Sequence, residues 1–218
     1  MKIKTYSYRY AEEILQHEKY KHIYDELIHI CENCPIPVYK EKSKAQKKKD
    51  IIQQLMNTYF RLQFVNLGWE TEPLATPETN ADGLRSDFRK TFQTDDGEDI
   101  TVQIEVEFGN VASSYRNYFK FQLSYSYKLT DICVLIVPCY HLSTRIDSAV
   151  SNFKKVKREL PSAKLSITVP TLVIGLDDHD CEEWNVKEIE SDLNVLKNPK
   201  NKYAERHNEI VQEYINDL

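Results

Sequence analysis

Apolar and polar residues alternate strictly between residues 100 and 108, which read ITVQIEVEF. All the even positions are apolar and all the odd positions are polar. A period of two over this length predicts a β-strand with one buried face. Two carboxylates, Glu105 and Glu107, lie on the polar face, for which exposure to solvent is the simplest explanation.

The same kind of pattern predicts helices and further strands along the chain. Apolar residues at helical spacing predict helices over 10–31, 48–64, 148–160 and 200–216. Apolar runs at 131–137 and 169–176 predict short strands that are buried on both faces. This alternation predicts a layered α/β fold, and we expect residues 1–218 to form a single domain.

Residues 119–129 are ambiguous. Their odd positions are all apolar or aromatic, which favours a strand. Asn110 or Ser113, however, could cap a helix that begins just before them. Periodicity and capping therefore leave both alternatives open here.

The segment before the acidic strand predicts its hairpin partner. Residues 95–97 read DDG, which predicts a three-residue loop with the glycine in the left-handed conformation. The resulting register pairs Phe92 with Ile100 and Phe88 with Ile104, so that the apolar residues share one face.

That register also places Asp87 opposite Glu105, with Glu107 next along the strand. Directly opposed like charges destabilise a sheet. A divalent cation would remove the repulsion, because carboxylates are hard oxygen ligands. Paired carboxylates also serve glycoside hydrolysis, but that reaction gives no role to the basic segments of this chain.

Charge is unevenly distributed along the chain. The formal net charge of -5 argues weakly against binding to nucleic acid. Bases, however, crowd residues 40–49 and 154–158, whereas acids gather in 95–107 and 177–192. The lysines that we expect to contact DNA phosphates are Lys47, Lys48 and Lys49. A basic surface beside an acidic metal site favours phosphodiester hydrolysis, in which a metal activates the attacking water.

Composition limits the class of protein. The sequence contains no run of 18 apolar residues and no apolar signal core at its start, so we expect a cytoplasmic protein without membrane contact. Five cysteines, an odd number, favour reduced thiols over a disulfide framework. Cys31 and Cys34 form a C-x-x-C, but no second motif completes a zinc site.

The acidic hairpin resembles the metal site of PD-(D/E)xK nucleases, in which an aspartate on one strand precedes Glu-x-Lys, or a variant of it, on the next. Residues 104–116, IEVEFGNVASSYR, are similar to the BamHI, BglII and BstYI group of type II restriction endonucleases. That group has glutamate or glutamine in place of the lysine. LSTRI at 142–146 and VPTLVIGL at 169–176 extend the resemblance, which covers roughly residues 1–177.

The resemblance implies a fold and a chemistry. The fold is a mixed central β-sheet flanked by helices, with a helix directly after the acidic strand, in a homodimer. Asp87 and Glu105 would bind Mg²⁺, for which Mn²⁺ can substitute, together with the carbonyl oxygen of Val106. Glu107, in the place of the usual lysine, would orient the attacking water.

The resemblance also implies how DNA is read. Asn110, Ser113 and Arg116 match positions that face the inner base pairs, and Arg145 matches one that reads an outer guanine. Thr144 replaces an acidic neighbour of that arginine, so we expect the outer base pair to differ or to be relaxed. A homodimer would cut a palindromic site, centred on GATC in this group, and leave 5′ overhangs.

Three functions fit these features. The first is a sequence-specific, metal-dependent DNA endonuclease, and the second is a structure-specific or repair nuclease of the same fold. The third is a DNA-binding protein whose catalytic site has decayed, which the absent lysine favours and the intact set of Asp87, Glu105 and Glu107 disfavours. Discrete fragments, a smear or no change after incubation with DNA and Mg²⁺ would distinguish the three.

Overall fold

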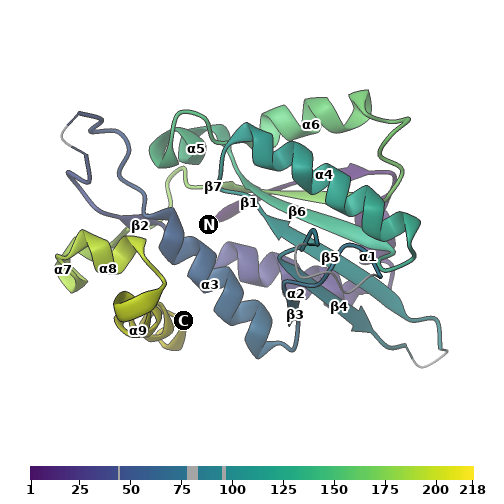
Figure 1. The fold of residues 1–218 in the computed structure, drawn as a ribbon, viewed down its shortest axis with the longest axis horizontal. Coiled ribbons are helices and arrows are strands. Elements are labelled where there is room, and N and C mark those ends of the chain that lie inside the picture. The colour runs from purple at the N-terminus through teal and green to yellow at the C-terminus, as the bar shows by residue number, and fades with distance from the viewer. Residues whose placement is uncertain (44, 78–82, 95–96) are drawn as a thin grey trace.

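A mixed β-sheet forms the centre of the molecule, in a computed structural model that describes residues 1–43, 45–77, 83–94 and 97–218 (Figure 1). Among these residues its strands are β1 (Lys2–Tyr8), β3 (Glu70–Thr71), β4 (Phe88–Phe92), β5 (Ile100–Val106), β6 (Ile132–Pro138) and β7 (Thr171–Asp177). They follow the order β1-β7-β6-β5-β4-β3. The central β5, β6 and β7 are parallel, whereas β1 and β4 run antiparallel to their neighbours. The expected fold class, a mixed central sheet, is confirmed.

Helices cover both faces of this sheet (Figure 1). One face carries α4 (Val111–Ser126) and α6 (Phe153–Ser162), and the other carries α1 (Ala11–Gln16), α2 (Lys21–Glu32) and α3 (Gln53–Asn66). The C-terminal helix α9 (Ala204–Asn216) packs against α3 from outside. The shorter elements are α5 (Tyr140–Ile146), α7 (Val186–Ile189), α8 (Leu193–Lys197), the 3-10 helix η1 (Asn201–Tyr203) and the paired strands β2 (Pro37–Val38) and β8 (Trp184–Asn185).

The predicted hairpin register is confirmed. Phe88 lies opposite Ile104 and Phe92 lies opposite Ile100. Residues 95 and 96 of the predicted turn lie outside the described residues, while Gly97 has the left-handed φ of 76° that we expected. The apolar face of β5 therefore joins the larger of two hydrophobic clusters, together with α2 and α3.

The polar face of β5 is buried, so the simple expectation of a solvent-exposed face is wrong. Gln103 is 0% exposed, Glu105 1% and Glu107 6%. The cause is α4, which crosses this face and bonds to it through Asn117 and Lys120. A carboxylate buried in this way needs a partner, because transfer of an unpaired charge from water is very costly.

Residues 119–129 settle as a helix for most of their length, since α4 extends to Ser126. Phe121 is fully buried against β6 and Tyr118 nearly so, while Phe119 is 57% exposed. The strand suggested by alternation is wrong, because the aromatic residues are distributed around the helix on both its buried and exposed sides.

Other elements depart from the sequence-based expectations. Residues 10–31 form two helices, because the chain turns at 17–20, where Tyr20 N–H donates to the His17 carbonyl at 2.8 Å. No glycine or proline marks this turn in the sequence. Strand β1 and helix α5 were not expected, whereas α3, α6, α9, β6 and β7 lie close to their predicted positions.

Candidate active site

The three predicted metal-binding residues meet where β4 begins and β5 ends. Asp87 directly precedes β4, and its Oδ2 accepts a hydrogen bond from Val106 N–H at 2.7 Å. Glu105 is the preceding residue of β5. The structure therefore brings Asp87, Glu105 and Val106 together at one end of the paired strands β4 and β5, as the hairpin register predicts.

Glu105 has one occupied and one open carboxylate oxygen. Its Oε2 accepts a hydrogen bond from Lys120 Nζ at 2.5 Å. Its Oε1 is buried and makes no hydrogen bond to any residue in the described part of the chain. The Ser86 hydroxyl lies near enough to lower the pKa of Glu105 but makes no bond of normal geometry to it. A buried oxygen without a partner is costly, and this one is available to a cation.

The electrostatics of the site favour cation binding. Burial and the charge of Asp87 raise the pKa of Glu105 to about 8, although Lys120 opposes both. Burial also raises the pKa of Asp87, against the Val106 N–H and Lys120. Buried carboxyls that repel each other release this strain by taking up a proton or a metal ion.

Glu107 is held by two donors. Its Oε1 accepts from Gly109 N–H at 2.6 Å, and its Oε2 accepts from Asn117 Nδ2 at 3.0 Å. Burial raises its pKa, and the hydrogen bond from Gly109 N–H opposes this. A carboxylate oxygen can accept a second hydrogen bond, so Glu107 is fixed in orientation and still able to receive a water.

The chemistry of these side chains suits a cation, but their oxygens do not converge on one point in the structure. Within the described ranges, no three His, Cys, Asp or Glu side chains converge closely enough to hold a metal ion. Each oxygen of Glu107 has a partner, in Gly109 and Asn117, whereas Glu105 is bonded to Lys120 through Oε2 alone. The donor set consists of hard oxygens, which suits Mg²⁺ or Mn²⁺, and the open oxygen of Glu105 supports that fit.

A cavity of about 490 Å³ opens beside Asp87 and Val106. Asn57 and Arg61 of α3 line it, together with Glu72. Glu72 is a residue that the sequence reading missed: its N–H donates to the Asp87 carbonyl at 3.0 Å, and its charge raises the pKa of Asp87. Strand β3 ends just before it and has only two residues, too few to show a period.

The predicted base-reading residues of α4 lie at the same end of the sheet. Asn110 Oδ1 accepts from Ala112 N–H at 2.9 Å, an arrangement that caps the start of α4. Arg116 is exposed, and its charge lowers the pKa of Asp87, so it lies within electrostatic reach of the predicted metal-binding residues. The side chain of Ser113 lies outside the described part of the structure.

The lysine-rich residues 40–49, here called the lysine segment, reach this end of the sheet as well. Lys47 and Lys48 are exposed. Lys49 Nζ instead pairs with Asp147 Oδ1 at 2.5 Å. Residues 147–151 in turn run beside the start of α4, where Val111 N–H donates to the Ala149 carbonyl. The structure thus links the lysine segment to the predicted base-reading positions at the start of α4 through residues 147–151.

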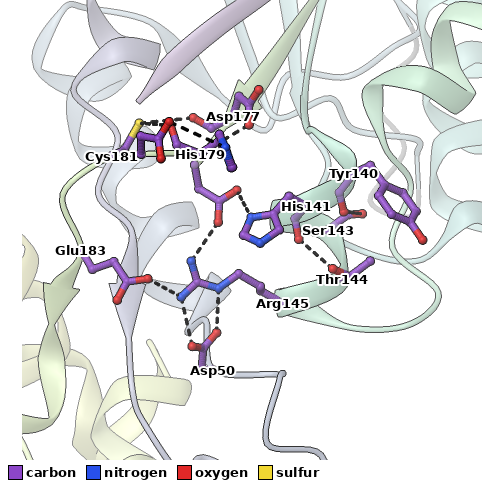
Figure 2. Close-up of polar contacts among 12 residues, drawn as sticks. Asp50, Tyr140, His141, Ser143, Thr144, Arg145, Asp177, His179, Cys181 and Glu183 are labelled. Carbon is purple, nitrogen blue, oxygen red and sulfur yellow. Dashed lines mark hydrogen bonds and ion pairs between the residues drawn. The ribbon is translucent and has the colours of Figure 1, made fainter.

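Arg145 of α5 lies in a cluster of carboxylates (Figure 2). Its guanidinium binds Asp50 twice at 3.0 Å, Asp178 at 2.9 Å and Glu183 at 2.7 Å. Burial alone would lower the pKa of Arg145, but Asp50 and Asp178 raise it above its ordinary value. Thr144 beside it is exposed, with its hydroxyl bonded to the His141 carbonyl. In this arrangement the donors of Arg145 are directed at the protein.

The chain matches one protein-family model and is similar to several solved structures. The model of a family described as restriction endonuclease BglII/BglIII matches residues 3–176. Two similar solved structures are BglII in complex with a DNA 16-mer and free BglII, each 16% identical over 81% of this chain. They are covered over 77% and 79% of their length, with TM-scores of 0.63 and 0.52. No curated protein matches the chain.

Proposed function

Because the chain belongs to the BglII/BglIII family of restriction endonucleases and is therefore a type II site-specific deoxyribonuclease, we propose the details of its reaction. It hydrolyses phosphodiester bonds of double-stranded DNA at a palindromic site centred on GATC, leaving 5′ overhangs. The reaction requires Mg²⁺, for which Mn²⁺ substitutes. The observation that carries this proposal is the hydrogen bond that Val106 N–H donates to Asp87, beside the open Oε1 of Glu105.

Asp87, Glu105 and the Val106 carbonyl would hold the cation. A bound divalent cation polarises a phosphoryl oxygen and lowers the pKa of a bound water. Asp87 is fixed by Val106 N–H, so its remaining oxygen has a defined direction. Glu107, fixed by Gly109 and Asn117, orients the attacking water by accepting a hydrogen bond from it.

Base reading is assigned to the start of α4. Asn110, Ser113 and Arg116 contact the inner base pairs, since amide and guanidinium groups bind adenine and guanine edges in pairs of hydrogen bonds. The influence of Arg116 on the pKa of Asp87 supports this placement, because bases and scissile phosphate must be reached by one protein surface.

Phosphate contacts and the outer base pair are assigned to the neighbouring segments. Lys47 and Lys48 are exposed and bind backbone phosphates, with Lys49 holding their segment to Asp147. Thr144 and Arg145 of α5 read the outer base pair. Arg145 has to exchange its carboxylate partners for a guanine edge to do so, which weakens discrimination at that position.

We also propose that the enzyme is a homodimer. A two-fold axis relates two active sites and two base-reading surfaces, which matches a palindromic site. Tyr115 and Phe119 of α4 are 52% and 57% exposed, and a large aromatic side chain on a helix surface is a typical contact between subunits. These residues lie on the helix that carries Arg116, so that dimer contact and base reading are joined in α4.

Residues 1–218 act as one nuclease domain, in the prokaryotic cytoplasm. The packing of the C-terminal helix α9 supports a single domain, because its buried His207 is hydrogen-bonded to Thr58 of α3 at 2.8 Å. No helix within the described ranges is both long enough and apolar enough to cross a membrane.

Digestion of plasmid and phage DNA tests the proposal. With Mg²⁺ we expect a fixed set of discrete fragments, and with excess EDTA we expect intact DNA. Full cleavage in EDTA would contradict the metal requirement, and a smear would contradict cleavage at one short site.

A further inference from the structure

A lysine reaches the acidic site from helix α4. Glu107 follows β5 directly and, by the family resemblance, stands where most nucleases of the class have a lysine. Lys120 of α4 enters the site from across the sheet face. Its side chain is 5% exposed, and its Nζ lies 2.5 Å from Glu105 Oε2 and 3.1 Å from the Arg85 carbonyl.

By itself, a buried ion pair such as that of Lys120 with Glu105 is weak evidence of a stabilising role, which leaves room for a functional one. A buried ammonium is destabilising unless it is paired and hydrogen-bonded, and replacing such a pair by apolar side chains is often neutral or stabilising. Here the charge of Lys120 lowers the pKa of each of the three site carboxylates, Asp87, Glu105 and Glu107. One lysine thus acts on the whole proposed cation site.

The contact also decides which oxygen of Glu105 remains open. Lys120 Nζ donates to Oε2 of Glu105. It also donates to the carbonyl of Arg85, which precedes Asp87 in the chain by two residues. Glu105 is thereby fixed at one oxygen, while Oε1 is buried without a hydrogen bond to any described residue. A free rotation of the carboxylate would remove this distinction.

We propose that Lys120 is a positioning residue of the nuclease site. It holds Glu105 by Oε2 so that Oε1 faces the cation, and it places in the site, from α4, a positive charge that β5 lacks. This inference rests on the proposed role of Asp87 and Glu105 as cation ligands.

Two measurements test the inference. Electron paramagnetic resonance measures the affinity for Mn²⁺ in the absence of DNA, and single-turnover cleavage with Mg²⁺ measures the reaction rate. For Lys120→Met we expect Mn²⁺ to bind about tenfold more weakly, the effect of losing a hydrogen bond to a charged group. The cleavage rate should fall by at least about tenfold while affinity for DNA changes less than about threefold, because phosphate and base contacts lie elsewhere. Should Lys120→Met not fold, Lys120→Leu, which also removes both the donor and the charge, takes its place with the same expectation.

Lys90→Met is the matched control. Lys90 is also a poorly exposed lysine that donates to a carbonyl, that of Leu67, and pairs with a glutamate, Glu26, but it contacts none of the site carboxylates in the described structure. It should bind Mn²⁺ and cleave DNA as the wild type does.

Two results would overturn the inference. Lys120 variants that bind Mn²⁺ more tightly would show that the lysine competes with the cation, and variants that match the wild type in both measurements would show a merely structural lysine. A wild-type protein that neither binds Mn²⁺ nor cleaves DNA would instead contradict the proposed function itself.

Discussion

Asp87 Oδ2 accepts a hydrogen bond from Val106 N–H at 2.7 Å, which fixes the first residue of the proposed cation site to the last residue of β5. The hydrogen bond crosses the hairpin diagonally, because Phe88 pairs with Ile104 and Asp87 lies one step beyond that pair. A carboxylate fixed by a backbone donor cannot relax away from Glu105. The repulsion between the two acids is therefore part of the folded structure.

Asp87→Asn and Glu105→Gln should each reduce DNA cleavage by at least about 10²-fold, the order expected when one electrostatic stabiliser of a reaction is removed. Binding to the cognate site, measured without a cleaving metal, should persist. Asp131→Asn is a matched control, because Asp131 accepts from Thr101 N–H, also at 2.7 Å, at the other end of β5. Equal loss of activity in all three variants would indicate damage to the sheet and not to a site.

The stability of the metal-free protein should depend on pH through Glu105. The pKa of Glu105 is about 8 in the folded protein and 4.5 when unperturbed, so the folded state binds the additional proton between these values. Its contribution to stability is complete below about pH 4.5 and is lost as the pH rises through about 8. The free energy of unfolding should therefore fall between pH 5 and 8 in the wild type relative to Glu105→Gln, as measured by urea denaturation at each pH. Parallel curves would contradict this assignment.

Cation binding should reverse that trend. A divalent cation binds the ionised carboxylates, so it stabilises the folded protein more where protons compete less. Mg²⁺ at one fixed concentration should raise the melting temperature more at pH 8.5 than at pH 6. The same rise at both values, or an undiminished rise in an Asp87→Asn, Glu105→Gln double variant, would place the cation elsewhere.

Lys47 and Lys48 should contribute affinity without sequence choice. Replacing both by Gln should weaken specific and non-specific DNA binding alike. The slope of log affinity against log salt concentration should become shallower by about one unit for each lost phosphate contact. Lys49→Gln should have a smaller effect of this kind, because its ammonium is engaged by Asp147. Lys21 and Lys128 are exposed lysines away from the start of α4 and serve as a paired control. An unchanged salt slope would show that the segment is only solvated.

Arg145→Ala separates two roles of this arginine. Loss of its bonds to Asp50, Asp178 and Glu183 should lower the free energy of unfolding by about 1–3 kcal/mol, between the values for exposed and buried ion pairs. If Arg145 also reads the outer base pair, discrimination there should fall by about 1–3 kcal/mol per half-site. Asp50→Asn, which loosens the same cluster and retains the guanidinium, should keep that discrimination. A loss of stability with unchanged specificity would make Arg145 an anchor of the fold alone.

Local rules were sufficient to predict the hairpin, whereas its role as a metal site is predicted from the family resemblance. The period of β5 and the turn glycine fixed the pairing of Phe88 with Ile104, and that register placed Asp87 beside the end of β5. Family resemblance, and not period, identified α4 as a helix, because aromatic residues at alternate positions mimic a strand.

Long-range packing explains what the sequence did not reveal. The burial of Glu105 depends on α4 crossing its face, and the ammonium that binds it comes from Lys120, within the stretch whose structure was ambiguous. The partners of Arg145 come from distant parts of the chain, with Asp50 just before α3 and Glu183 just before β8. No local pattern encodes contacts of this kind.

The central claim is metal-dependent cleavage by this site at a GATC-centred palindrome, and sequencing the ends of digested genomic DNA tests it most directly. With Mg²⁺ we predict that the ends of wild-type digests share one palindromic sequence with GATC at its centre and a 5′ overhang, with more variation at the outer pair than at the inner ones. Asp87→Asn should leave the same DNA intact. Ends without a common palindrome, a centre unrelated to GATC, or the same ends from Asp87→Asn would contradict the account.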